Sequence, residues 1–227
     1  MTLELRPISL GALSAHPLRG EKGEKRPGHL TTSLIVQDDV RILIDPSLPP
    51  RVLAERLDER AGISPDAIDM VFLTSFRPIG RRGLSLFPDA RWMIAEPERE
   101  AIGVGLIQEY ERASDASDES LLQTLRDEIS LLQRCESAPD TLAEGVDLFP
   151  LNGLTPGFCG LLLADPKWTM VIAGDAVPTV EHLVAGQVLS EAHDLKAAQA
   201  SLGEVVEIAD FIVPGRDGLT PNPIRRW

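Results

Sequence analysis

The sequence lacks long apolar runs. No stretch approaches the roughly 20 apolar residues that a transmembrane helix needs, so we expect no membrane partner. The segment Met1–Gly11 carries Glu4 and Arg6 inside its apolar part, which does not fit a signal peptide. These features predict a cytoplasmic protein.

Cysteine is also scarce, and basic residues are outnumbered. Cys135 and Cys159 are the two cysteines, and their spacing predicts neither a disulfide framework nor a metal site. The 22 Lys and Arg residues face 35 Asp and Glu residues, which leaves a net charge of −13. Nucleic acids and anionic membranes bind basic surfaces, so we expect neither as the main partner.

The composition fits an ordinary globular protein with a full core, because 43% of the residues are hydrophobic and 25% are charged. The segment Val71–Thr74 is apolar and partly β-branched, which predicts a buried parallel strand. Pro78 and Gly80 then break the chain, and a helix is expected from Arg81 to Phe87. Ligands bind at the carboxyl ends of the strands in an open α/β sheet. The loop Ser75–Gly80 is therefore expected to form the floor of the main pocket.

Further strands and helices alternate along the chain, which is typical of an α/β protein. Turn signals separate them, and Pro17–His29 is rich in Gly, Pro and charge, which predicts a flexible loop. By its composition it is a solvated loop without a role; the alternative, that it overhangs the pocket, is implied only by the family resemblance of the later segments. The other expected strands are 2–9, 32–36, 40–44, 91–95, 160–164, 169–173 and 211–213, and the other expected helices are 51–61, 117–136 and 191–209.

The helix expected at Ser117–Glu136 departs from this alternation. Its apolar residues are spaced by three and four, as in packed helices: Leu122, Leu125, Ile129 and Leu132. The helix spans too few heptads for a coiled coil. It either covers its own sheet, which the pattern favours, or forms a homodimer contact.

Several segments, in order, resemble the metallo-β-lactamase-fold hydrolases. They are Leu43-Ile44-Asp45-Pro46, Ile68–Thr74, Arg82-Gly83-Leu84 with Leu86-Phe87-Pro88, Leu151–Gly157, Ala173–Ala176 and Pro214-Gly215-Arg216. The resemblance spans roughly residues 31–217. It implies a four-layer αββα sandwich over residues 1–227 as a single domain, with 17–29 as a flexible loop and 117–136 as a helical insertion.

The resemblance also locates the zinc-ligand positions of that family. The Thr-His-x-His-x-Asp-His motif corresponds to Thr74–Gly80, so Ser75, Arg77, Ile79 and Gly80 stand at its ligand positions. Leu154 and Arg216 stand at two later histidine positions, and Asp175 is the one family ligand that remains. Zinc needs three or four His, Cys or carboxylate ligands at one point. We therefore expect no metal and no other cofactor.

The remaining residues offer no obvious substitute chemistry. His16, His29, His182 and His193 are scattered, and we expect them to be surface or capping residues, with the segment of His182 leading away from the pocket. Ser75 has no recognisable base and no Gly-x-Ser-x-Gly turn. The sequence therefore predicts no catalytic residue.

These observations favour a catalytically degenerate binding or scaffold protein with a small-anion pocket. Arg77, Asp175 and Arg216 are expected to form a salt bridge or an anion site, because an arginine fork can meet a carboxylate at two points. The expected pocket lining is Ser75, Phe76, Ile79, Gly80 and Leu154. The alternative is a metal-independent enzyme acting on an anionic small molecule in the same pocket. An ordinary zinc hydrolase is disfavoured because the chain contains no His-x-His.

Overall fold

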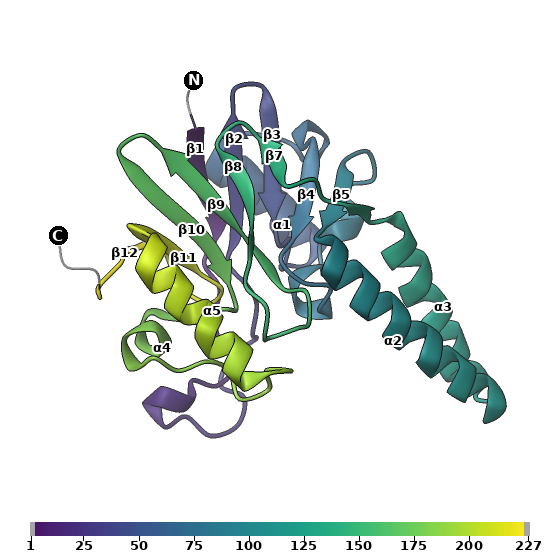
Figure 1. The fold of residues 1–227 in the computed structure, drawn as a ribbon. Coiled ribbons are helices and arrows are strands. Elements are labelled where there is room, and N and C mark those ends of the chain that lie inside the picture. The colour runs from purple at the N-terminus through teal and green to yellow at the C-terminus, as the bar shows by residue number, and fades with distance from the viewer. Residues whose placement is uncertain (1–2, 225–227) are drawn as a thin grey trace.

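Two six-stranded sheets form the centre of the structure, a computed structural model that describes residues 3–224 (Figure 1). The first sheet has the order β1-β2-β3-β4-β5-β6 and the second β12-β11-β10-β9-β8-β7. The strands of the first sheet are β1 (Leu3–Ser9), β2 (Thr32–Gln37), β3 (Val40–Ile44), β4 (Met70–Leu73), β5 (Arg91–Ile94) and β6 (Glu136–Ser137). Those of the second are β7 (Thr141–Ala143), β8 (Val146–Pro150), β9 (Cys159–Asp165), β10 (Trp168–Gly174), β11 (Phe211–Pro214) and β12 (Thr220–Pro221).

Parallel and antiparallel pairs are mixed in both sheets. In the first sheet β3, β4, β5 and β6 pair in parallel, and β1–β2 and β2–β3 are antiparallel. In the second, β10 and β11 are parallel neighbours, and the remaining pairs are antiparallel. The carboxyl ends of β4, β10 and β11 are therefore the places where loops of a ligand site are expected.

Three apolar clusters separate four layers, which confirms the αββα sandwich. One cluster lies between the sheets and includes Ile44 and Phe72 facing Leu161 and Ile172. A second lies under α1 (Pro50–Ala61) on the outer face of the first sheet. A third lies under α4 (Val180–Ala185) and α5 (Leu195–Ile208) on the outer face of the second sheet. No helix among residues 3–224 is long and apolar enough to span a membrane.

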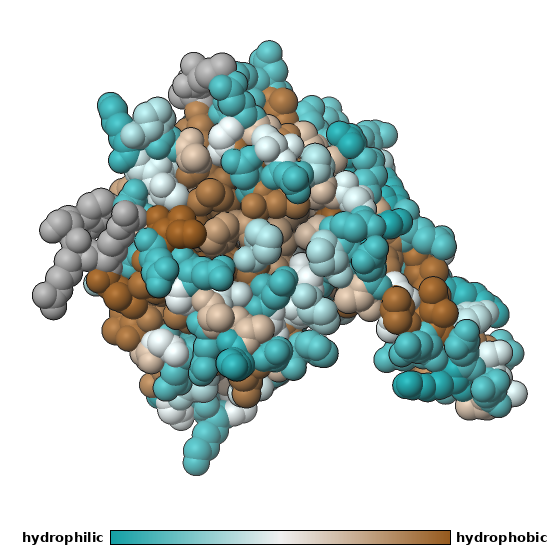
Figure 2. Space-filling view, viewed as in Figure 1, coloured by the Kyte–Doolittle hydropathy of each residue, from teal (hydrophilic) through white to brown (hydrophobic). Residues whose placement is uncertain are grey.

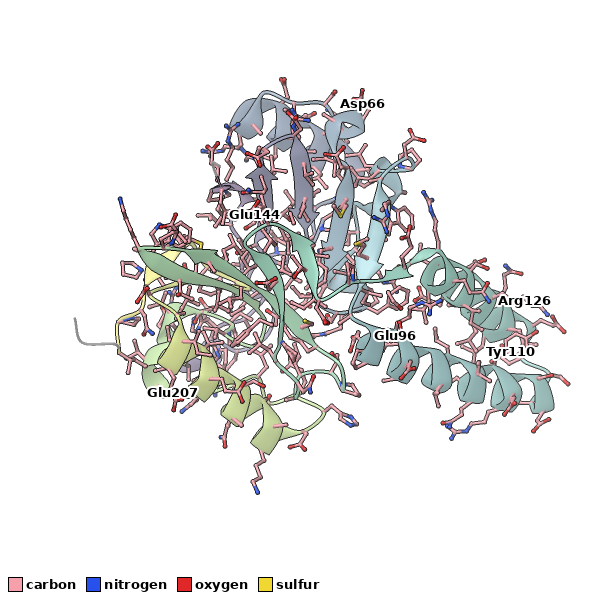
Figure 3. The ribbon with its side chains drawn as sticks, turned by 45° about the horizontal axis from the view of Figure 1, so that its top comes forward. Asp66, Glu96, Tyr110, Arg126, Glu144 and Glu207 are labelled. Atoms are coloured by element: carbon pink, nitrogen blue, oxygen red, sulfur yellow. The ribbon has the colours of Figure 1, made fainter. Side chains whose placement is uncertain are left out.

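Two further helices form an arm that projects from the sandwich (Figure 1). They are α2 (Glu96–Asp115) and α3 (Glu119–Arg134). Near the tip, Arg126 of α3 lies beside Tyr110 of α2, with Nε donating to the phenol oxygen at 3.3 Å (Figure 3). The sequence analysis missed α2, because its apolar residues form no clear stripe.

The packing of α3 differs from the favoured expectation that it covers its own sheet. Leu122 and Leu125 pack against Ala113 and Tyr110 of α2, away from the sheet. Leu132, near the base of the arm, joins the cluster on the first sheet. The apolar stripe is therefore mainly the contact between the two helices of the arm. Figure 2 shows apolar surface on the arm as well.

The helix expected from Arg81 to Phe87 is absent, and that expectation is wrong. Two 3-10 turns, Pro78–Gly80 and Leu84–Leu86, occupy the region. The region makes 3-10 hydrogen bonds in place of helical ones, because Leu84 N donates to Arg81 O and Phe87 N donates to Leu84 O, each at 3.1 Å. Ser47 Oγ donates to Ile79 O at 2.6 Å and Gly83 N donates to Pro46 O at 2.8 Å, which holds both turns against the segment after β3. A β-carbon at Gly83 would lie 2.7 Å from Leu48 O, so this close approach requires glycine.

Candidate anion site

Asp175 and Arg216 leave neighbouring parallel strands and meet in a buried ion pair. Asp175 follows β10 and Arg216 follows β11, so the register of the two strands places both side chains at one edge of the sheet. Arg216 Nε donates to Asp175 Oδ1 and Nη2 donates to Oδ2, both at 2.7 Å. Such a two-point contact is the strongest geometry available to an arginine and a carboxylate.

Arg77 reaches the same carboxylate from the first sheet. It follows β4, and its Nη1 donates to Asp175 Oδ2 at 3.2 Å. Its Nη2 lies 3.7 Å from Glu191 Oε1, which is too long for a hydrogen bond. The Arg77 side chain is 28% exposed and that of Glu191 is 55% exposed. Arg216 is therefore fully engaged by the protein, whereas half of the Arg77 fork is only loosely held.

Gly215 allows this approach of Arg216 to Asp175. A β-carbon on Gly215 would lie 2.5 Å from Asp175 Oδ1 and 2.6 Å from Asp175 N. Gly215 N also donates to Val177 O at 3.0 Å, which fixes the turn. The glycine in the Pro214-Gly215-Arg216 segment is thus explained by steric fit and not by a metal.

A second buried carboxylate, Asp45, fixes the end of β4 next to the site. Its Oδ1 accepts from Thr74 N at 2.9 Å and its Oδ2 accepts from Thr74 Oγ1 at 2.7 Å. Burial raises the pKa of Asp45 to about 7, although the hydrogen bonds from Thr74 oppose the rise. Asp45 also adopts a left-handed φ of 47°, a conformation that aspartate tolerates better than most residues.

A third buried carboxylate, Glu98, connects two loops near the site. It lies in the first turn of α2, and its Oε1 accepts from Phe76 N and its Oε2 from Gly157 N, each at 3.1 Å. The charge is stabilised by two backbone amides and by the positive end of the helix dipole. Because the sequence analysis missed α2, it also missed Glu98.

The Asp175 cluster borders a cavity of about 450 Å³. Its wall combines polar and apolar side chains from the second sheet's loops and from the N-terminal segment. It is lined by Leu13, Ser14, Ala15, Pro17, Glu21, Arg77, Ile79, His182, Gln187, Val188, Leu189, Ser190, Glu191 and Arg216. A cavity of this size holds a small molecule.

The structure places the predicted site residues in two groups. Arg77, Asp175 and Arg216 are brought together, and Arg77, Arg216 and Ile79 line the cavity. The other predicted lining residues are buried outside that wall. Ser75, Phe76 and Gly80 are buried because the loop after β4 turns inward into the core or against Asp45. Leu154, which follows β8, is buried in the cluster under α4 and α5.

Two histidines, His16 and His182, are buried at the site, so the expectation that they are surface residues is wrong. His16 does occupy the N-cap position of the 3-10 turn Pro17–Arg19, although its side chain makes no capping hydrogen bond. His182, in α4, lines the cavity, and its ring centroid lies 5.3 Å from that of His16. Thr179 Oγ1 lies between them, 2.8 Å from His182 Nδ1 and 3.3 Å from His16 Nε2. Burial, followed by the charge of His16, lowers the pKa of His182. The two residues are far apart in the sequence, so no local spacing indicates their contact.

The segment of residues 12–29, here called the cover, lies across one side of the cavity. Leu13 and Pro17 belong to the cavity wall, so the cover overhangs the pocket, as one of the two expectations for this loop states. Its two ends pair at an antiparallel bridge between Ala12 and His29. Arg19 pairs with Glu181 of α4, which ties the far end of the cover to the second sheet's helices.

The residues at the site do not fit a metal ion. Asp175 uses both oxygens on arginines, and guanidinium groups occupy two of the positions where the family has histidine ligands. Within residues 3–224, no group of three or more His, Cys, Asp or Glu side chains is arranged to hold a metal ion. The positive charge at this point of the fold comes from arginine.

Comparisons with solved structures agree on the class of fold. A putative metallo-β-lactamase from Thermotoga maritima superposes with a TM-score of 0.67 at 19% identity, covering 97% of this chain and 100% of its own. AidC, a dizinc quorum-quenching lactonase in complex with a product, superposes with a TM-score of 0.62 at 20% identity, and the match covers 78% of this chain and 67% of AidC. A mutant of the AiiA protein of B. thuringiensis, with N-decanoyl-L-homoserine bound at its active site, superposes with a TM-score of 0.60 at 15% identity. That match covers 90% of this chain and 87% of the mutant.

The chain thus has the metallo-β-lactamase fold, as its sequence motifs predict. Its solved structural neighbours are hydrolases of that fold, among them a dizinc lactonase. No protein-family model matches the sequence, and no curated protein matches it either. At these identities the likeness establishes the fold alone.

Proposed function

We propose that this protein is a catalytically degenerate member of the metallo-β-lactamase fold that binds a small anion, a carboxylate or a phosphate, without a metal. One observation carries the proposal. Arg77 is partly exposed on the wall of the 450 Å³ cavity, and its second nitrogen has only a loose contact with Glu191.

Glu191 marks the place of the ligand in this proposal. Its carboxylate is mostly solvated and lies beyond hydrogen-bond range of Arg77, so little free energy holds it there. A ligand anion can take its place and accept from Arg77 Nη2 at normal distance. Arg216 and Asp175 stay paired behind it and hold the Arg77 guanidinium in position.

The available nucleophiles support a binding role. Ser75 is buried away from the cavity wall. Burial raises the pKa of Cys159 to about 12 and that of Cys135 to about 11, so both thiols stay protonated near neutral pH. Neither thiol belongs to the cavity wall.

The alternative is a metal-independent enzyme that acts on an anionic small molecule in the same pocket. His182 favours this reading, because its ring lines the cavity and its Nδ1 is oriented by Thr179. A general base with its second nitrogen fixed by a neighbour is a common catalytic arrangement. The proposal predicts that this histidine transfers no proton to or from a substrate.

Calorimetry with inorganic phosphate and with acetate at low salt tests the binding role. We expect Arg77→Gln to weaken anion binding at least tenfold and Glu191→Gln to strengthen it several-fold, because the competing carboxylate is removed. Arg51→Gln is the matched control: Arg51 is a 91% exposed arginine on α1 outside the cavity, and its loss leaves affinity unchanged. Equal weakening by both arginine variants would indicate a non-specific charge effect and contradict the proposal.

Metal analysis and an activity screen separate the proposal from its alternatives. The purified protein is expected to contain well below one equivalent of zinc, iron or manganese after dialysis. Stoichiometric metal whose removal destabilises the fold would overturn the proposal. Turnover of lactones, esters or phosphate esters that disappears in His182→Gln would instead establish the metal-independent enzyme.

A further inference from the structure

The cover is attached to α4 through one buried group of side chains. His16, on the cover, and His182, on α4, are both nearly inaccessible to solvent. Thr179, which caps α4, lies between their rings and contacts both. Because this group joins the cover to the wall of the cavity, its state decides how firmly the cover is closed.

The hydrogen-bond capacity of Thr179 limits the protonation of the two rings. Its hydroxyl has one proton and two lone pairs, and one lone pair accepts from the backbone nitrogen of His182 at 3.3 Å. One proton and one lone pair remain for the two imidazole nitrogens. Where the hydroxyl donates to one of these nitrogens, that nitrogen carries no proton and its imidazole is neutral. The hydroxyl proton can instead go to the Glu181 side chain, which also bonds Thr179, but two imidazolium rings 5.3 Å apart would repel each other. The arrangement therefore favours at least one neutral imidazole.

The surroundings tolerate one imidazolium and oppose a second. Glu181 Oε2 lies 3.5 Å from His16 Nε2, and the hydrogen bond from Arg19 lowers the pKa of Glu181 to about 2, so this carboxylate stays charged. Asp175 and Glu191 also attract a charge on His182, but burial and His16 outweigh them. His16 Nδ1 is buried with no hydrogen-bond partner among residues 3–224, so a proton there would be unsatisfied.

We propose that His16, Thr179 and His182 form a latch that holds the cover closed while at least one imidazole is neutral, and that mild acid releases the cover and opens the cavity. The latch would regulate access to the anion site. It rests on the proposed function only for the identity of the ligand. The cover is further held by the pairing of Arg19 with Glu181, so release requires this contact to part as well.

The direction of the pH effect follows from linkage. The pKa of His182 is lower with the cover closed than in an open, solvated state near 6.5. Neutral His182 therefore stabilises the closed cover above about pH 6.5, and this stabilisation is lost as the pH falls below that value. Acid favours the open cover.

Hydrogen exchange of the ligand-free protein tests the latch. Between pH 7.5 and 5.5, and after correction for intrinsic exchange, we expect peptides covering 12–29 and 179–183 to lose protection together, at least tenfold. In His182→Gln, whose amide can still bond Thr179 but does not titrate, the acid effect should disappear, and in His16→Gln, which removes the second ring, it should become smaller. His193→Gln, which changes an exposed histidine outside the latch, should keep it.

Imidazole titration by NMR provides the second measurement, because it requires no variant to fold. We expect His182 to titrate at a lower pH than an unperturbed imidazole, whose pKa is near 6.5. Exchange that is equal at pH 7.5 and 5.5, or a His182→Gln protein with the parent's full acid response, would overturn the latch. Neither experiment contains an anion ligand. A negative result would therefore contradict the latch without contradicting anion binding, which calorimetry tests separately.

Discussion

Arg216 holds both carboxylate oxygens of Asp175, through Nε and Nη2, at 2.7 Å each. Both groups are almost completely buried, so neither charge can be solvated if its partner is lost. The pair occupies the place where the family resemblance puts a metal, and it joins the ends of β10 and β11.

Loss of either partner of this pair is expected to be costly. Asp175→Asn should destabilise the protein by about 3–5 kcal/mol, because it leaves the buried charge of Arg216 unpaired. Arg216→Met should cost less, about 1–3 kcal/mol, because Arg77 Nη1 still donates to Asp175 Oδ2. The double variant should cost less than the sum by about 1–3 kcal/mol, since the two residues are in contact. Urea unfolding measures all three. The exposed pair Arg51 and Glu55 is the control, with a coupling below about 1 kcal/mol.

Asp45 should make the protein less stable as the pH rises. Its folded pKa of about 7 exceeds the value of about 3.9 for an exposed aspartate, so the folded state binds the proton more tightly. Its contribution is therefore complete below about pH 4 and is lost as the pH rises to about 7, with a slope of at most about 1.4 kcal/mol per pH unit. Subtracting the stability profile of Asp45→Asn from that of the parent isolates this slope. A flat difference would show that Asp45 is charged throughout.

Glu98→Gln should destabilise the protein by about 1–3 kcal/mol, because the amide can accept from only one of Phe76 N and Gly157 N and leaves the other buried donor unpaired. Glu96→Gln, at the exposed start of the same helix (Figure 3), loses the same charge near the helix dipole. Its cost should stay below about 0.5 kcal/mol. Equal costs measured by urea unfolding would mean that the dipole alone explains Glu98.

The arm offers a test of the homodimer proposal. Leu125→Asp should destabilise the protein by about 3 kcal/mol or more, because Leu125 is buried between α2 and α3. Ile107→Asp, at a position that is 56% exposed, should leave the stability unchanged within about 0.5 kcal/mol. If the apolar surface of the arm pairs with a second copy, Ile107→Asp should also reduce the molecular mass found by sedimentation. An unchanged mass would exclude this face as the interface.

The sequence predicted the fold because strand periodicity and the ordered turn motifs are local signals. Gly62, for example, ends α1 with a left-handed φ of 66°, as its position after an amphipathic helix indicates. The segment after β4 was less predictable, because its two 3-10 turns are held by hydrogen bonds to Ser47 and Pro46, which are distant in the sequence. Helix α2 was missed because its buried side chains include Glu98, which periodicity arguments count as exposed.

The site was predicted in part, and the limit has a physical cause. The proximity of Arg77, Asp175 and Arg216 could be predicted from the sequence, because each residue follows a strand in a recognisable motif. The pairing of His16 with His182 depends on how a turn-rich segment folds back across the second sheet, and no short-range pattern encodes that path. The same holds for Glu191, which meets Arg77 only through the tertiary fold.

The anchoring of the arm has a consequence for how the molecule can be divided. Both of its helices are fastened to the segment after β4, α2 through Glu98 on Phe76 N and α3 through the pairing of Glu128 with Arg81. Excising the arm would leave amide donors at Phe76 and Gly157 without their acceptor and expose Arg81. We therefore expect the arm to fold together with the segment after β4, so that a chain trimmed of the arm would lose packing around Phe76 and Arg81 next to the pocket.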